Sequence, residues 1–111
     1  MSTIPTPTIE TKIIDAQEVT RTVWTVGDHT LTRIQHEGAP HASWSTQRLN
    51  HEAPNVYDDF DWFNGDAPVT YNVNWSAQGD RSPEEAFEYA ARIMAAAEAA
   101  RVFTAIRAEN K

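Results

Sequence analysis

The clearest pattern of apolar and polar positions in the chain lies in residues 69–76. Apolar and polar residues alternate there without a break, in the order Val69, Thr70, Tyr71, Asn72, Val73, Asn74, Trp75 and Ser76. This alternation predicts a β-strand with one buried and one polar face, because successive side chains of a strand point to opposite sides. Antiparallel sheets commonly keep one solvated face, so the pattern favours an antiparallel sheet.

A second β pattern, in residues 18–36, is interrupted near its centre by Gly27 and Asp28. The flanking residues are mostly β-branched or aromatic, and these types suit a pleated surface. Glycine tolerates the positive φ that the first central position of a type II′ turn requires, so we predict a hairpin with a two-residue turn. The predicted pairs are Val26 with His29, Trp24 with Leu31, and Val23 with Thr32.

Shorter segments on either side complete the expected β structure. Residues 9–14 and 41–49 are expected to form strands, the second of them more exposed. We expect residues 1–8 to be a flexible tail, because two prolines prevent regular pairing there. Residues 50–68 contain proline and Asn-Gly interruptions and are expected to form a long connection.

The last third of the chain predicts one long helix. Ser82 suits the N-cap, Pro83 the first helical position, and Glu85 completes a capping box with Ser82. No glycine or proline follows Pro83, so the helix should continue to about Asn110. A helix of roughly 27 residues is about 40 Å long, whereas a domain of this size is about 30 Å across. We therefore expect the helix to overhang its sheet.

This helix carries two apolar stripes. The first, expected to lie on the sheet, consists of Ala86, Phe87, Ala90, Ile93, Met94 and Ala97. The second lies nearly opposite and consists of Ala95, Ala99, Val102, Phe103 and Ile106. Because one sheet cannot cover both stripes, the second is expected to be the self-association surface of a homodimer. The alternative is that the N-terminal strand or the long connection covers it.

These elements together predict an α+β fold. The expected architecture is an antiparallel sheet of four to five strands with one long C-terminal α-helix packed across a face. A chain of 111 residues has the size of one domain, so we expect a single domain over residues 9–111.

Charge and composition restrict the function. Sixteen acidic residues against nine basic ones give a net charge of −7, which disfavours direct binding to nucleic acid or anionic lipid. The chain has no cysteine, so disulfides and cysteine-based zinc sites are excluded. It also lacks an apolar run long enough to span a bilayer and a signal-peptide pattern. A cytoplasmic protein without a membrane partner is therefore expected.

One segment combines acidic and aromatic residues, within a stretch from Leu49 to Asp80 that holds six acidic residues and no Lys or Arg. The residues proposed to bind a partner are Tyr57, Asp58, Asp59, Phe60, Asp61, Trp62 and Phe63. Aromatic anchors surrounded by charge are typical of protein interfaces, and acidic residues would steer a basic partner. The alternatives are aromatic side chains that cover the sheet and acidic residues that form a solvated loop.

Candidate chemistry is sparse. The four histidines lack the spacing of a metal site and are expected at surface turns. We find no pattern for an activated serine or a glycine-rich phosphate loop. The sequence therefore predicts no catalytic residue, no cofactor and no bound metal, and a non-enzymatic protein.

The end of the chain resembles a strand-to-helix ending found in small uncharacterised proteins of actinobacteria and their phages. The resemblance covers about 35 residues and is carried by the runs Asn74-Trp75-Ser76-Ala77-Gln78-Gly79 and Ser82-Pro83-Glu84-Glu85-Ala86. It implies a phage or phage-like accessory protein, and it transfers no activity and no site residues.

The leading functional hypothesis is an interaction protein of the phage accessory or inhibitor kind. It would bind a host or phage protein through the acidic aromatic segment. One alternative is a homodimeric protein that binds a small nucleotide-like ligand, with Trp24, Trp44 or Trp75 stacking on a ring. Another is an acidic inhibitor that mimics DNA.

Overall fold

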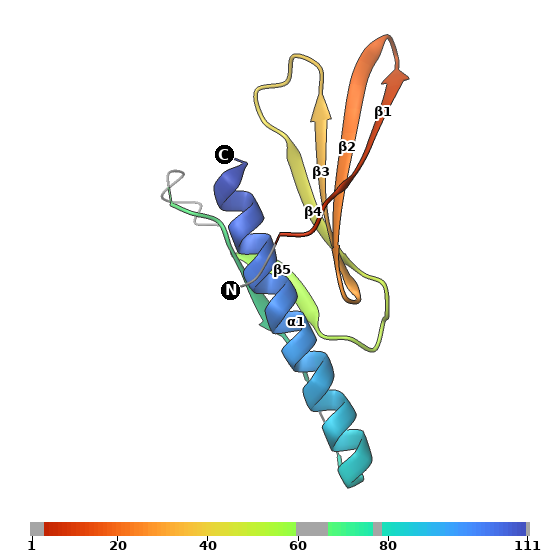
Figure 1. Ribbon diagram of the computed structural model, residues 1–111, viewed down its shortest axis with the longest axis vertical. Helices are drawn as coiled ribbons and strands as arrows, with labels where there is room; N and C mark the ends of the chain where they lie inside the picture. The colour runs from red at the N-terminus through yellow and green to blue at the C-terminus, as the bar shows by residue number, and fades with distance from the viewer. Residues whose placement is uncertain (1–3, 60–66, 77–78, 111) are drawn as a thin grey trace.

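The computed structural model describes residues 4–59, 67–76 and 79–110, which form two antiparallel sheets and one long helix. Four strands make the larger sheet, in the order β1-β2-β3-β4. Their bounds are Thr8–Ile14, Gln17–Val26, His29–His36 and Ser43–Arg48. The smaller sheet pairs β5 (Asn55–Asp59) with β6 (Thr70–Asn74), and the helix α1 spans Pro83–Glu109. The α+β fold with an antiparallel sheet and one long helix is therefore confirmed (Figure 1).

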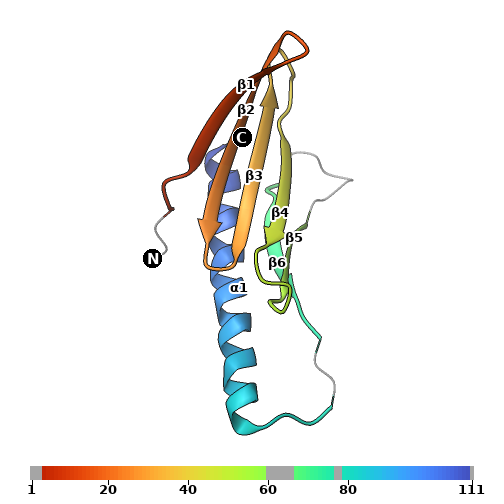
Figure 2. The same cartoon turned by 90° about the vertical axis from the view of Figure 1, so that its right-hand side faces the viewer.

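The hairpin of β2 and β3 has the predicted register. Val26 pairs with His29, Trp24 with Leu31, and Val23 with Thr32. Gly27 has φ of +57°, the positive value that the predicted turn assigns to its first central residue. Figure 2 shows the four strands of the larger sheet side by side, with α1 behind them.

The connection predicted over residues 50–68 contains a strand, so this prediction is wrong in part. β5 pairs with β6 along five residues, and the Thr46 hydroxyl donates a hydrogen bond of 2.8 Å to the Val56 carbonyl. Local patterning missed β5 because its acidic residues, Asp58 and Asp59, are poor strand formers. Pairing with β6 is a contact distant in sequence, and it overrides that local preference.

The segment expected to be the N-terminal tail reaches both β1 and the core. β1 begins at Thr8, and Ile4 packs, partly buried, against the core. The prolines of this segment prevent strand pairing, but they do not prevent side-chain burial. The flexibility of the segment stays a prediction.

The predicted helix signals are all present. The Ser82 hydroxyl accepts a hydrogen bond from the Glu85 amide, and the Glu85 carboxylate accepts one from the Ser82 amide. These bonds satisfy two amide groups of the kind that a helix N-terminus leaves without an intrahelical partner. The helix ends at the C-cap Asn110, and its N-terminal half extends beyond the larger sheet (Figure 1).

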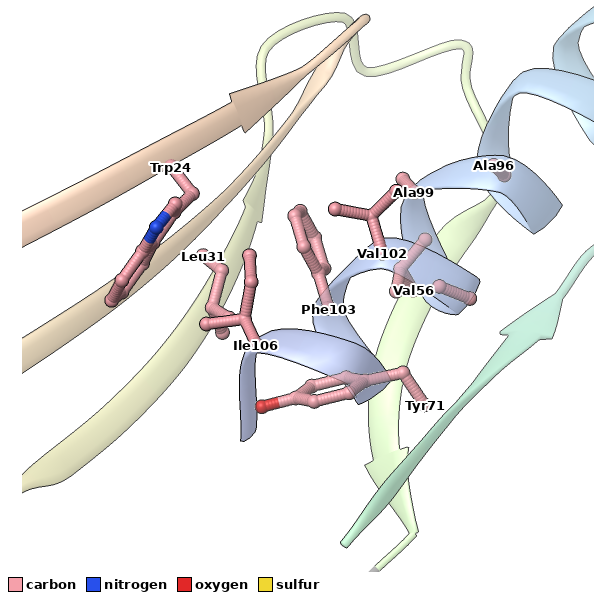
Figure 3. Packing of buried hydrophobic residues seen from close by; sticks show 10 residues of the cluster. Trp24, Leu31, Val56, Tyr71, Ala96, Ala99, Val102, Phe103 and Ile106 are labelled. Carbon is pink, nitrogen blue, oxygen red and sulfur yellow. The ribbon is translucent and has the colours of Figure 1, made fainter. Parts of the chain in front are cut away.

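The core shows that the two apolar stripes of α1 were assigned to the wrong environments. The buried helix residues are Ala96, Ala99, Ala100, Val102, Phe103 and Ile106. They pack against Trp24 and Leu31 of the larger sheet and against Val56 and Tyr71 of the smaller one (Figure 3). The side chains of Phe103 and Tyr71 meet edge to face, with ring centroids 5.9 Å apart.

The stripe expected on the sheet is largely exposed. Phe87 and Met94 are 76% and 73% exposed, Ala86, Ala90 and Ala97 are also exposed, and Ile93 is half-buried. Helical periodicity identifies apolar stripes, but it cannot say which one meets the sheet. β6 ends at Asn74, and α1 begins at Pro83 beyond the end of the sheets, so only the C-terminal half of the helix runs beside the strands (Figure 1).

One histidine departs from its expected place. His29 is 2% exposed and lies beside the turn between β2 and β3, so the expectation of a surface histidine is wrong for it. Burial lowers the pKa of its imidazole, which favours the neutral ring.

The two stripes make opposite predictions for stability. Phe103→Ala should lower the free energy of unfolding by about 3–5 kcal/mol, because it leaves a cavity in the core. Phe87→Ala, the matched control on the exposed stripe, should change it by about 0.5 kcal/mol or less. Urea denaturation of both variants measures the difference, and equal losses would contradict the packing described here.

Candidate functional site

The acidic aromatic segment is described only in part, and its three described residues lie on two faces of β5. Phe60, Asp61, Trp62 and Phe63 lie outside the described residues. Of the rest, Tyr57 and Asp59 lie on one face of the smaller sheet, opposite Asn72 and Thr70. Asp58 pairs with Tyr71 and therefore lies on the other face.

The outer face of β5 is polar. Tyr57 is 44% exposed, and the Asn72 amide donates a 3.2 Å hydrogen bond to the Asp59 carboxylate. Within the part of the segment that the structure describes, Tyr57 and Asp59 are therefore available together, and Asp58 is not beside them.

The predicted self-association surface is wrong in its residues. Ala99, Val102, Phe103 and Ile106 are buried within their own chain, and Ala95 is exposed. Side chains that are already packed against Leu31 and Trp24 cannot also meet a second copy. The homodimer itself stays a prediction and would need another surface.

A groove of about 740 Å³ lies between the larger sheet and the C-terminal end of α1. We call it the arginine–tryptophan groove. It is lined by β3, β4, the residues before β6 and the last turns of α1. The lining residues are Arg33, Gln35, Pro40, His41, Ala42, Trp44, Ala67, Pro68, Val69, Thr104, Arg107, Ala108 and Asn110. Its volume falls within the range of small-molecule sites, about 300–1,000 Å³.

Trp44 positions both arginines of the groove. The guanidinium carbon of Arg107 lies 4.5 Å from the centroid of the Trp44 ring, and that of Arg33 lies 5.7 Å from it. A guanidinium over an indole ring is attracted by the electrons of the ring face. Trp44 is itself held by stacking with Trp24, at a centroid distance of 5.9 Å and an interplanar angle of 14°.

Hydrogen bonds complete the support of the two arginines. Arg107 donates a 2.9 Å bond to the Tyr71 hydroxyl, and Arg33 donates a 3.1 Å bond to the Gln35 side-chain oxygen. Thr104 supports the same corner, because its hydroxyl accepts a 3.0 Å bond from the Tyr71 amide. Hydrogen bonds therefore hold the side chains on the inner wall of the groove in fixed positions.

The charge of the groove is not balanced by its described lining. Neither Arg33 nor Arg107 forms an ion pair with a carboxylate of the described residues. The Nε atom of Arg33 is buried and has no hydrogen-bond acceptor among those residues. Two cations without a carboxylate partner among the described residues make this groove of an acidic protein a candidate anion site.

Two smaller cavities lie elsewhere. One, of about 330 Å³, is lined by His29 and Arg48, and the other, of about 340 Å³, by Arg48 and Trp75. The Arg48 guanidinium donates to the His51 and Ala53 carbonyls, so it is already engaged. Within residues 4–59, 67–76 and 79–110, no group of three or more His, Asp or Glu side chains could hold a metal ion.

Two of the three tryptophans proposed to stack on a ligand lie outside the groove. Trp24 is buried in the core, and Trp75 is 52% exposed beyond the end of β6. Only Trp44 lines the arginine–tryptophan groove.

The two arginines were not singled out from the sequence, although a signal was present. Arg33 follows Leu31 by two positions in a strand, so it lies on the inward face of the sheet. Arg107 follows Phe103 by four positions in a helix, so it lies on the buried stripe. A charged residue at a core-facing position is uncommon unless it is paired or functional.

Comparison with protein-family models, with curated proteins and with solved structures finds no match to this chain. Function has to be inferred from geometry. In the described part of the chain, no helix has both the length and the apolar character needed to cross a bilayer.

The link between Tyr71 and Arg107 gives a stability prediction. Tyr71→Phe removes the acceptor of the Arg107 hydrogen bond and should lower the free energy of unfolding by about 1 kcal/mol. Tyr57→Phe, at an exposed tyrosine of the same sheet, should cost almost nothing. Urea denaturation at neutral pH compares them, and equal losses would contradict a structural role for the Tyr71 hydroxyl.

Alkaline pH adds a second readout. Burial raises the pKa of the Tyr71 phenol above its ordinary 10.0, and the Arg107 hydrogen bond offsets this only in part. The folded state therefore holds the Tyr71 proton more tightly than the unfolded state. The resulting stabilisation is present below pH 10 and is lost as the pH rises through the folded pKa, so Tyr71→Phe should flatten this decline.

Proposed function

We propose that this protein binds a small anionic ligand in the arginine–tryptophan groove and that its role is non-enzymatic. The observation that carries the proposal is the pair of guanidinium groups, Arg33 and Arg107, held on Trp44 without a carboxylate partner among the described residues. Guanidinium groups bind carboxylates and phosphates through paired, charge-assisted hydrogen bonds. The ligand class is therefore a small carboxylate or phosphate compound.

The unsatisfied Nε of Arg33 supports the same conclusion. A buried donor without an acceptor costs about 1–3 kcal/mol. A small shift of the Arg33 side chain toward a bound anion would remove this cost. The free energy of binding would then include two contributions, the contact with the anion and the hydrogen bond that the buried Arg33 Nε lacks in the free protein.

The uncharged lining suits a ligand with a polar body. Gln35, His41 and Asn110 place polar side chains in the lining, and the half-buried Trp44 supplies aromatic surface. A nucleotide-like ligand, as one of the sequence hypotheses proposes, has both an anionic group and a ring. Comparison of ligands with and without a ring separates the contribution of the arginines from that of Trp44.

Calorimetric titration with inorganic phosphate, citrate and adenosine monophosphate tests the proposal. Wild type should bind at least one of these saturably, and Arg33→Gln and Arg107→Gln should each weaken binding about tenfold or more, because a hydrogen bond to a charged group contributes about 1.5–3 kcal/mol. The control is Arg21→Gln, since Arg21 pairs with Ile34 on the opposite face of the sheet. Millimolar probes that fail to bind, or variants that bind like wild type, would remove the proposal.

A second candidate function is recognition of a basic protein partner by the outer face of β5, as the leading sequence hypothesis holds. The exposed Tyr57 ring beside the Asp59 carboxylate supports it. The phage accessory role, the cytoplasmic location and the DNA-mimic alternative remain proposals from the sequence.

The two faces of β5 provide a sharp test of this second candidate. If a host or phage protein binds the outer face, Tyr57→Ala and Asp59→Asn should each weaken binding about tenfold or more, as expected for anchor residues. Asp58→Asn should have little effect, because Asp58 lies on the other face with Tyr71. Surface plasmon resonance with the captured partner measures the affinities, and an equal effect of all three substitutions would contradict the assignment.

A further inference from the structure

The most exposed apolar surface of the helix lies on the side that faces away from the sheets. We call it the outer helical face and define it by Phe87, Ala90, Met94, Ala97 and Arg101. All five residues are exposed, and Phe87 and Met94 are the most exposed large apolar residues described in the chain. Exposing two such side chains on one helical stripe is unfavourable for a monomer.

The spacing of this face is that of paired helices. Phe87, Met94 and Arg101 are each seven residues apart, so they follow one another along a single seam. Ala90 and Ala97 occupy the intervening positions, three residues after Phe87 and Met94. Small alanines between larger residues let a second helix approach closely.

We propose that a second copy of the chain packs antiparallel on this face, with the two-fold axis passing beside Met94. In this arrangement Met94 meets Met94 of the other copy. Phe87 lies seven residues before Met94 and Arg101 seven residues after it, so each Phe87 ring meets the Arg101 guanidinium of the other copy. Both ends of the seam thereby gain a cation–π contact.

Charge complementarity is what selects a second copy as the occupant. The face has an apolar aromatic end and a cationic end at equal distances from its centre, so it is complementary to itself when reversed. Antiparallel helices also place opposite ends of their dipoles side by side. Arg101 already forms a 3.0 Å ion pair with Glu98, and its side chain is 69% exposed in that pair. Exposed pairs of this kind contribute little to stability.

The fold leaves room for this pairing. The sheets pack on the opposite side of α1, through Val102, Phe103 and Ile106. A second helix on the outer helical face therefore does not collide with the sheets of the first copy. The seam from Phe87 to Arg101 is about 21 Å long. Such an interface is smaller than a standard stable one, so we expect a dimer that dissociates on dilution, in the micromolar range.

Cross-linking through single cysteines tests the geometry, because the chain has no cysteine of its own. With diamide as oxidant, Met94→Cys should form a disulfide dimer rapidly, since the two thiols meet at the axis. Ala105→Cys is the matched control, because Ala105 is exposed, lies three helical turns after Met94 on the same side of α1, and does not line the groove. Its thiol lies about 16.5 Å along the helix from the axis, so the two copies hold it about 33 Å apart and it should not cross-link. A parallel dimer would cross-link both variants, and random collision would cross-link them at the same low rate; either result overturns the proposal.

Sedimentation velocity over a concentration series tests the chemistry of the same seam. Wild type should shift from monomer to dimer, and Met94→Glu should remain monomeric at concentrations at least tenfold higher, because two carboxylates would face each other. A mixture of Met94→Glu with Met94→Lys should restore the dimer. Ile13→Glu, at a residue of β1 with a similar exposure of 70%, should associate like wild type. Wild type that remains monomeric, or a dimer lost in Ile13→Glu and kept in Met94→Glu, overturns the proposal.

Discussion

The structure depends on the packing of one helical stripe, centred on Phe103 and Ile106, between two sheets whose strands do not pair with each other. Phe103 reaches the larger sheet at Leu31 and the smaller one at Tyr71 (Figure 3). A side chain that is fully buried against both sheets fixes their relative position. Without this stripe, the apolar faces of both sheets would be left uncovered. The smaller sheet in particular would be unstable, because a two-stranded sheet is marginal alone.

This packing also determines where the groove forms. Arg107 follows Phe103 by one helical turn, so the turn that completes the core brings Arg107 to the edge of the same contact. Trp44 stacks on the core residue Trp24 and thereby presents its ring to both arginines. The candidate ligand site is therefore built on the rim of the core, where side chains are held by packing and still border a cavity.

The same constraint leaves the other half of α1 outside the core. A helix of 27 residues is longer than the sheets beside it, and its buried residues begin only at Ala96. The N-terminal half therefore presents its own apolar residues to solvent, and a second copy would cover them. The proposed ligand site and the proposed pairing surface thus lie on different parts of one helix, and neither requires the other. The net charge of −7 favours a dispersed protein at low concentration, while the local cations Arg33, Arg107 and Arg101 would make the specific contacts that we propose.

The sequence alone determined the elements that depend on interactions between neighbouring residues. The capping box at Ser82 and Glu85 determined the start of the helix, and Gly27 with Asp28 determined the hairpin register, because capping and turn geometry involve only neighbouring residues. The alternation around Tyr71 likewise determined β6 and its inward face, although Trp75 lies beyond the strand.

Tertiary structure alone decided which stripe of α1 is buried, that Asn55–Asp59 form a strand, and that Arg33 and Arg107 meet at Trp44. Each of these outcomes depends on contacts between residues far apart in the chain. Periodicity records that a face is apolar, and only the path of the chain past the sheets decides what covers that face.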